Sequence, residues 1–232
     1  MSVKLESSLT DLMTSLAVIF ILLMVAMINN VGQSGKSEIK EIHEQLEQKG
    51  IDCVIREDDP LACTITISNN DLLFGFKESA ISSKGQAYLN DRFPQIMETL
   101  MEKNLQEKIN GVFIEGYTDQ TGDPNENLKL SQDRSFAVGY FVLNNVFANN
   151  PEYREHLLKW LYLNGRGEQN PFKFDNYSYK YDFKPISLKQ NRVFEIEDIR
   201  KALSRRVELT IRVKSFSQRT KQEIQSASNP SP

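Results

Sequence analysis

The chain has 232 residues, of which 40% are hydrophobic and 25% charged, and its formal net charge at pH 7 is −3. This length allows one or two domains with a sizeable core, and the mildly acidic balance excludes the strongly basic face that nucleic-acid binding requires. Its two histidines, His43 and His156, are isolated, and the sequence offers no nucleophile–base pair or metal-ligand cluster, so we expect neither an enzyme nor a metal site.

The first predicted element is an apolar run from Leu12 to Ile28 that contains no charged residue. With residues 9–11 it is about 20 residues long, which matches the ~30 Å hydrocarbon core of a bilayer. A cleaved signal peptide is the alternative, but the preceding MSVKLESS lacks a basic excess and no convincing small-residue cleavage site follows. We therefore predict a short cytoplasmic tail at residues 1–8 and a retained transmembrane helix at residues 9–29.

Asp11 stands near the start of this apolar run, and Thr14 and Ser15 follow it at helical spacing. A carboxylate at membrane depth is costly and normally marks an ion path or a buried partner. The three side chains therefore form a candidate ion site. The alternative is that Asp11 caps the helix N-terminus, where its charge meets the positive end of the helix dipole.

Residues 30–50 are predicted to be a linker with a short helix at residues 37–49. Ile39, Ile42 and Leu46 form one stripe of this helix, a pattern typical of a helix that packs on a partner. The stripe is too short to indicate a coiled coil.

A hairpin is expected next, with strands at residues 52–56 and 63–68 and a turn around residues 58–60. Pairing about this turn places Cys53 and Cys63 opposite each other. In an oxidising compartment the pair can form a disulfide, and otherwise the two cysteines are small buried hydrophobic residues.

The rest of the domain, which ends at residue 214, alternates between helices and strands and predicts an α+β sandwich with helices against one sheet. Helices are expected at residues 83–102, 126–147 and 152–161, and strands at residues 111–116, 162–165 and 206–213. The helix at residues 126–147 is expected to face the core with Leu130, Phe136, Ala137, Tyr140, Phe141 and Val142. Residues 171–201 are an aromatic and charged insertion, and residues 215–232 a disordered tail.

The loop and helix that begin at Gly116 read GYTDQTGDPNENLKLSQDR, and this segment resembles the OmpA-like peptidoglycan-binding family. The family pattern, G-[HY]-T-D-x-x-G followed by N-x-x-L-S-x-x-R, is filled by Gly116, Thr118, Asp119, Gly122, Asn127, Leu130, Ser131 and Arg134. Gly165, Gly167 and Pro171 look like its G-x-G…P strand. Residues 204–208, SRRVE, look like its N-R-R-V-E close, with Ser204 in place of Asn. The resemblance covers residues 74–213.

The chemistry of these residues suits a diaminopimelate end of peptidoglycan, which carries an ammonium and a carboxylate. Asp119 can accept from the ammonium, and the forked guanidinium of Arg134 can hold the carboxylate. The resemblance implies that these two are the principal ligand residues. It implies supporting roles for Thr118, Asn127, Ser131 and Arg206. The alternative is that Asp119 and Arg134 form a structural ion pair that holds the loop.

The whole layout resembles the B subunit of a MotB-type stator, whose span matches the segment LTDLMTSLAVIFILLMV. The resemblance implies that Asp11 binds the translocated ion, H⁺ or Na⁺, with no other cofactor. It also implies that a homodimer sits inside a pentamer of ZorA/MotA-like A subunits in the bacterial inner membrane, with the C-terminal domain in the periplasm. The short tail and the insertion look more like the B subunits of Zorya anti-phage defence (ZorB) than flagellar ones. A flagellar stator, an ExbD or TolR type transducer and a passive peptidoglycan tether are the alternatives.

Overall fold

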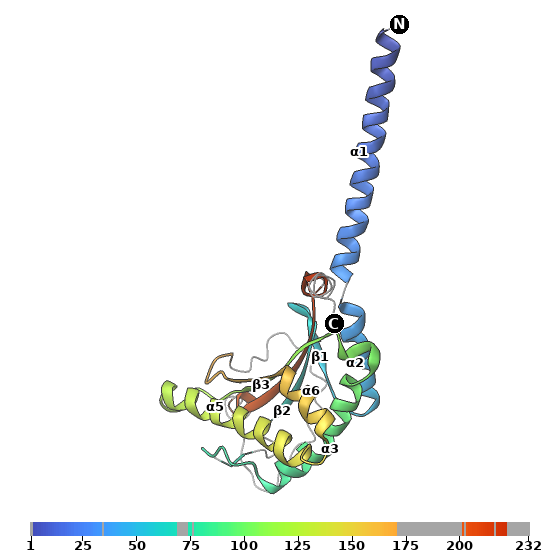
Figure 1. Ribbon diagram of the computed structural model, residues 1–232. Coiled ribbons are helices and arrows are strands. Elements are labelled where there is room, and N and C mark those ends of the chain that lie inside the picture. The colour runs from blue at the N-terminus through green and yellow to red at the C-terminus, as the bar shows by residue number, and fades with distance from the viewer. Residues whose placement is uncertain are drawn as a thin grey trace. The chain divides into compact units, whose positions relative to one another are not determined.

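The computed structural model describes residues 2–33, 35–68, 74–75, 77–170, 201, 203–215 and 217–221. The chain divides into two compact units (Figure 1). One unit comprises residues 1–37 and 214–232 and contains helix α1 (Ser2–Gln33), and the other comprises Glu38–Val213 and contains the sheet. The predicted insertion at 171–201 and the predicted tail at 215–232 lie almost entirely outside the described residues.

Helix α1 is continuous over 32 residues. Asp11 therefore lies inside the helix and not at its N-terminus, which removes the alternative that it caps this helix. Thr14 and Ser15 follow Asp11 by about one turn, on the same side of the helix. In the part of the chain that the structure describes, no helix is long and apolar enough to cross a membrane. The transmembrane helix at residues 9–29 stays a prediction.

The second unit is built on one open sheet of five strands in the order β1-β2-β5-β3-β4. The strands are β1 (Val54–Arg56), β2 (Asp59–Ser68), β3 (Ile109–Gly116), β4 (Leu161–Gly165) and β5 (Arg206–Val213). β3 and β4 are parallel, and every other neighbouring pair is antiparallel. The mixed α+β class is confirmed, and β5 has the predicted bounds.

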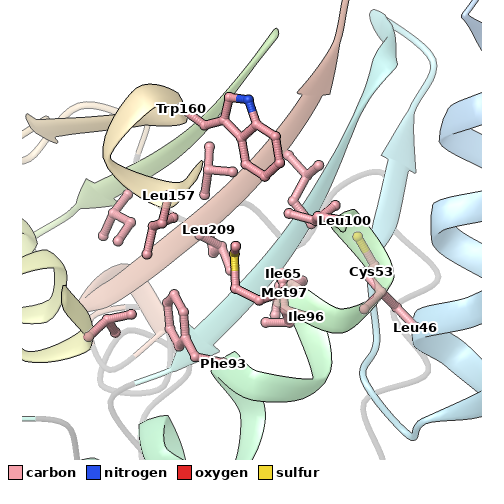
Figure 2. Packing of buried hydrophobic residues seen from close by; sticks show 14 of the residues in the cluster. Leu46, Cys53, Ile65, Phe93, Ile96, Met97, Leu100, Leu157, Trp160 and Leu209 are labelled. Atoms are coloured by element: carbon pink, nitrogen blue, oxygen red, sulfur yellow. The ribbon is translucent and has the colours of Figure 1, made fainter. Parts of the chain in front are cut away.

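Helices cover one face of this sheet (Figure 1). They are α2 (Lys36–Gln48), α3 (Ser83–Leu100), α4 (Lys103–Gln106), α5 (Pro124–Phe141), the π-helical turn η2 (Val142–Val146) and α6 (Pro151–Trp160). Figure 2 shows Phe93 and Met97 of α3 packed with Trp160 of α6 against the sheet. Burying side chains of this size stabilises the fold by about 1.5–3 kcal/mol each.

Helix α2 contributes to the same core. Ile39, Ile42 and Leu46 are each 1% exposed or less, so the predicted apolar stripe is buried along its whole length. Glu38, in the first turn, pairs with Lys108 just before β3 at 3.3 Å. The compact unit also begins at Glu38. The helix that the sequence assigned to a linker is therefore packed as part of the domain.

The buried face of α5 differs from the one expected. Phe136 and Tyr140 are 57% and 58% exposed and stack on each other with ring centroids 6.0 Å apart. Of the six residues in the expected stripe, only Val142 is fully buried. The helix instead buries a polar stripe over its first three turns, made of Asn127, Ser131, Arg134 and Ser135. The expectation failed because the start of α5 packs against loops and strand ends, where polar partners replace apolar ones.

Gly116, at the end of β3, allows α5 to lie directly on the sheet. A Cβ at this position would come within 2.2 Å of the Ser131 carbonyl oxygen, which is backbone and cannot turn aside. We expect Gly116→Ala to lower the free energy of unfolding by about 3 kcal/mol or more, measured by urea denaturation. Gly139→Ala is the matched control, because its Cβ would meet the Leu163 side chain, which can rotate. Equal losses for the two variants would contradict this reading.

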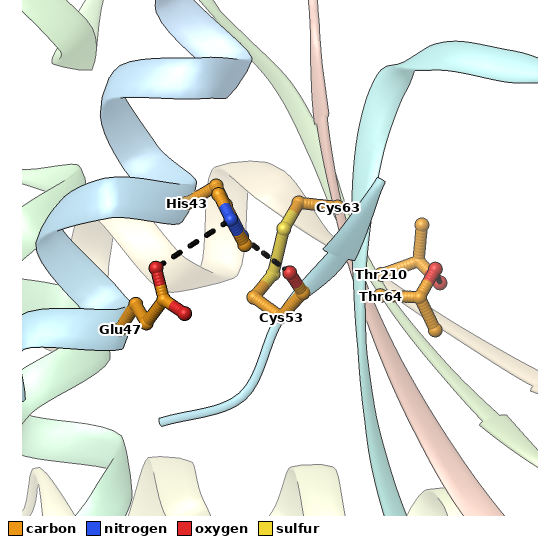
Figure 3. The surroundings of a disulfide bond; sticks show 6 residues. All are labelled: His43, Glu47, Cys53, Cys63, Thr64 and Thr210. Carbon is orange, nitrogen blue, oxygen red and sulfur yellow. Dashed lines mark hydrogen bonds and ion pairs between the residues drawn. A yellow bond between two sulfur atoms is a disulfide. The ribbon is translucent and has the colours of Figure 1, made fainter. Parts of the chain in front are cut away.

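The hairpin of β1 and β2 carries the cysteine pair. The structure joins Cys53 to Cys63 in a disulfide with a Cα–Cα distance of 5.6 Å (Figure 3). The register differs from the expected one, since Ile55 is the residue opposite Cys63 and a bulge follows between Ile55 and Arg56. The two cysteines therefore meet diagonally. On the α2 side, His43 Nδ1 is hydrogen-bonded to the Cys53 carbonyl oxygen at 2.5 Å.

Removing the cysteine pair should weaken the domain. We expect Cys53→Ser combined with Cys63→Ser to lower the free energy of unfolding by about 2–3 kcal/mol, since the lost bond closes a short loop in the unfolded chain. Urea denaturation followed by fluorescence of the buried Trp160 measures this loss. Reductant should produce the same loss in the wild type and none in the double variant. A wild type whose thiols are both alkylated without reductant would show that the bond is absent.

Candidate functional site

The candidate site lies where three adjacent strands of the sheet meet. The parallel strands β3 and β4 end at the same edge, and the antiparallel β5 begins there. Backbone hydrogen bonds join the three segments, from Thr118 N to Gly167 O at 2.8 Å and from Tyr117 N to Arg206 O at 2.9 Å. The residues that follow β3 are thereby held between the end of β4 and the start of β5.

Hydrogen bonds within the loop between β3 and α5 fix its conformation. The Asn127 amide donates to the carbonyl oxygens of Asp119 at 3.3 Å and Thr121 at 3.2 Å. Asp123 caps α5, because its Oδ1 accepts from the backbone N–H groups of Asn125 and Glu126 at 2.9 and 3.1 Å. The loop therefore presents Asp119 from a fixed backbone.

Two hydroxyl groups lie on the buried side of this loop. Ser131 is fully buried, donates to Leu128 O at 2.7 Å and accepts from Gly167 N at 2.8 Å, so it ties α5 to the segment after β4. Thr118 is 4% exposed, and its Oγ1 has no hydrogen-bond partner within the described residues. A buried hydroxyl without a partner is a position where a ligand or water oxygen fits.

Asp119 is 8% exposed, and both of its carboxylate oxygens are engaged. Oδ1 accepts from Thr121 N at 2.9 Å, and Oδ2 pairs with Nη1 of Arg205 at 3.1 Å. Within the described residues, Asp119 is thus paired with Arg205 and not with Arg134. The structural ion pair considered for Asp119 and Arg134 is not the one that forms.

Arg134 is held rigidly on α5 and is 4% exposed. Nε donates to Glu78 O at 2.9 Å, Nη2 donates to Gly75 O at 3.3 Å, and the guanidinium lies over the Phe74 ring at 5.1 Å. Burial lowers the pKa of Arg134, the charge of Arg205 lowers it further, and the charge of Asp119 opposes them. Arg134 still remains a cation near neutral pH.

Arg206, predicted to assist in binding, lies apart from this cluster. Its Nε pairs with Glu208 at 2.6 Å, and its guanidinium lies over the Tyr117 ring at 4.1 Å. Burial, followed by the charges of Glu208 and Glu115, raises the pKa of Tyr117 and keeps its hydroxyl protonated. Arg206 therefore belongs to a separate network of polar groups at the ends of β3 and β5.

Arg205 is the site residue that the sequence analysis missed. It stands beside Arg206 in the motif SRRVE, just before β5. Both arginines contact the segment after β3, but Arg205 pairs with Asp119 whereas Arg206 lies over the Tyr117 ring. The alternation was a usable signal, because it places Arg205 on the same side as the buried Val207 and Leu209 and Arg206 on the opposite side.

The cluster therefore combines one carboxylate, Asp119, with two guanidiniums, Arg134 and Arg205, and it carries a net positive charge. The carboxylate suits a cationic group of a ligand, and the guanidiniums and the Thr118 hydroxyl suit an anionic one. Within the described ranges, no three His, Cys, Asp or Glu side chains gather as metal ligands would. The arrangement fits a small zwitterionic group.

Comparison with known proteins shows which families and solved structures this chain resembles. Residues 73–177 match the OmpA family. Zorya protein ZorB of Escherichia coli (strain Crooks) is 30% identical over 157 residues, 58% of this chain and 66% of that protein. Outer membrane protein A of Shimwellia blattae is 31% identical over 103 residues, 44% of this chain and 36% of that protein. The solved structure of a putative MotB-like protein from Desulfovibrio vulgaris is 16% identical, with a TM-score of 0.48, over 80% of this chain and 98% of that one.

These similarities cover only parts of the curated relatives. The chain spans just under two thirds of ZorB and little more than a third of the outer membrane protein. The family match covers the loop after β3, helix α5 and strand β4, which supply most of the candidate site. The chain therefore carries an OmpA-like domain.

Proposed function

We propose that this chain is the B subunit of an ion-driven membrane motor, anchored to peptidoglycan by its OmpA-like domain. The observation that carries the proposal is the cluster of Asp119, Arg134 and Arg205 at the strand ends of that domain. The proposal that the chain is a motor subunit rests on its similarity to ZorB and on the sequence of α1.

The ligand that suits the cluster is the diaminopimelate end of a peptidoglycan stem peptide. Its ammonium binds the Asp119 carboxylate, and its carboxylate binds Arg134. The carbonyl oxygens of Glu78 and Gly75 fix the Arg134 guanidinium, and its Nη1 has no hydrogen bond within the described residues. Hydrogen bonds between ionised groups are the strong ones, and a guanidinium that is already oriented loses little entropy on binding.

The membrane half follows from the chemistry of residues 9–29. We propose that they cross the bacterial inner membrane, with residues 1–8 in the cytoplasm and residues 51–214 in the periplasm. Asp11 then binds H⁺ or Na⁺ at membrane depth, where a carboxylate is too costly to keep without such a role. Thr14 and Ser15 complete the polar face. A periplasmic domain also suits the cysteine pair, because thiols oxidise there.

The partners follow from the position of Asp11 in α1. A carboxylate at membrane depth needs protein beside it, because lipid offers its charge no partner. We propose that two copies of the chain lie inside a pentamer of ZorA/MotA-like A subunits. Ion binding and release at Asp11 then drive the pentamer to rotate around the anchored dimer.

We assign the motor to anti-phage defence because the relative is a Zorya protein. The test is to express this chain beside its native neighbouring genes and to compare phage plating with and without it. We expect protection only when the chain is present. Unchanged plating combined with restored motility in a strain without its flagellar B subunit would favour the flagellar alternative. A passive tether predicts that protection, if present, does not depend on Asp11.

A further inference from the structure

The ion pair between Asp119 and Arg205 occupies the place that the proposed function gives to the ligand ammonium. We propose that Arg205 is a second ligand residue, which leaves Asp119 when the ammonium arrives and joins Arg134 on the ligand carboxylate. The inference rests on the proposed peptidoglycan binding and deepens it, because binding then requires both charges of the ligand together.

The first support is the way Asp119 is occupied. Thr121 N binds one carboxylate oxygen at 2.9 Å and Arg205 binds the other at 3.1 Å. The Arg205 side chain is 29% exposed, whereas that of Asp119 is 10% exposed. An ammonium that binds the second oxygen would lie against the like charge of Arg205, which favours the departure of Arg205, and Arg205 is the more accessible partner of the pair.

The second support is a pair of buried donors beside Asp119. Arg205 Nε and Thr118 Oγ1 are both buried, and within the described residues neither has a hydrogen-bond partner. Buried donors without acceptors are costly and rare in folded proteins. Both belong to residues that adjoin Asp119, one as its sequence neighbour and one as its ion-pair partner. A carboxylate placed here would supply the missing acceptors.

The third support is the charge balance. Arg134 and Arg205 lie close enough for the charge of one to affect the other, and Asp119 is the carboxylate they share. A ligand with an ammonium alone would displace Arg205 without offering it an anion. A ligand with both groups replaces one internal ion pair by two intermolecular contacts. The cluster should therefore prefer diaminopimelate to a lysine whose α-amino and α-carboxyl groups are blocked as amides, because this blocked lysine keeps an ammonium but has no carboxylate.

The experiment is competition against binding to purified sacculi, using the full chain in detergent. Free meso-diaminopimelate and Nα-acetyl-L-lysine amide, the blocked lysine, serve as competitors. For the wild type we expect diaminopimelate to displace the protein at a concentration about 10- to 100-fold lower than the blocked lysine, the size of one hydrogen bond to a charged group. In Arg205→Met this ratio should fall to about 1–3. Diaminopimelate should lose potency, and the blocked lysine should gain it because Asp119 is no longer occupied.

Two further variants keep the test decisive. Arg205→Lys retains the charge without the fork, and we expect an intermediate ratio from it even if Arg205→Met folds poorly. Arg212→Met removes an arginine of β5 that is also paired with an aspartate, Asp59, and it should leave the ratio unchanged. A wild type that prefers diaminopimelate, together with Arg205 variants that keep the full ratio, overturns the role of Arg205 and leaves the anchoring function intact. A wild type that does not bind sacculi overturns both.

Discussion

Replacing Asp11 with Asn should abolish phage protection while the chain still assembles in the membrane. Asn keeps the shape of the side chain and its hydrogen bonding, but it cannot exchange a proton or neutralise a cation. If ion flow through Asp11 powers the motor, plating of phage on Asp11→Asn cells should equal that on cells without the gene. The measurement is plating efficiency at matched expression, together with membrane fractionation and co-purification of the neighbouring A subunit.

Two further variants serve as comparisons for Asp11→Asn. Asp11→Glu keeps an ionisable group one methylene further out and should retain part of the protection. Asp91→Asn makes the same chemical change on an exposed position of α3, where the carboxylate contacts Arg92 and Gln95, and should protect fully. Full protection by Asp11→Asn would mean that the chain is a passive tether, since the structure has Asp11 inside α1 and leaves it no role as the N-terminal cap.

Replacing Asp119 with Asn should weaken binding to sacculi by about 10- to 100-fold, because the hydrogen bond to the ligand ammonium is then no longer one between two charged groups. Arg134→Met should weaken binding to a similar degree by removing the carboxylate donor. Co-sedimentation of the full chain with purified sacculi over a range of protein concentrations measures both effects. Thermal unfolding of each variant shows whether the domain remains folded at the assay temperature.

The matched control for this change lies in the same loop. Asp123→Asn makes the same substitution at the cap of α5, where Asn accepts the same backbone hydrogen bonds as Asp. It should bind sacculi as the wild type does. Asp119→Asn protein that binds equally well would remove Asp119 from the site and, with it, the present assignment of the ligand ammonium.

The regular elements were predictable from the sequence because each carries its own periodicity. The alternation in β5 gave its bounds, and the stripe of Ile39, Ile42 and Leu46 gave the buried face of α2. The cysteine hairpin was predicted with the wrong register, because the alternation of apolar and polar residues does not reveal the bulge after Ile55. Phe136 and Tyr140 were assigned to the core from their apolar character alone.

The loop residues of the candidate site were predictable from the sequence, but the ion pair between Asp119 and Arg205 was not. The resemblance in residues 116–134 brings Thr118, Asp119, Asn127, Ser131 and Arg134 together, and the structure holds them at one strand edge. The alternation of β5 indicates that Arg205 shares the side of Val207 and Leu209. Its pairing with Asp119 also depends on how the loop after β3 packs against the start of β5, and local sequence does not determine that packing.

Under the proposed localisation, the cysteine pair ties maturation of the domain to its export. The cytosol keeps thiols reduced, so Cys53 and Cys63 would then join only after they have left it. β1 is an edge strand of the sheet, and a loosely held edge strand is where other chains and proteases attach. A copy that fails to be exported would therefore lack the disulfide that holds β1 at the edge of the sheet. Proteases in the cytosol could then remove such copies, whereas copies that are exported and form the disulfide would resist proteolysis at this edge.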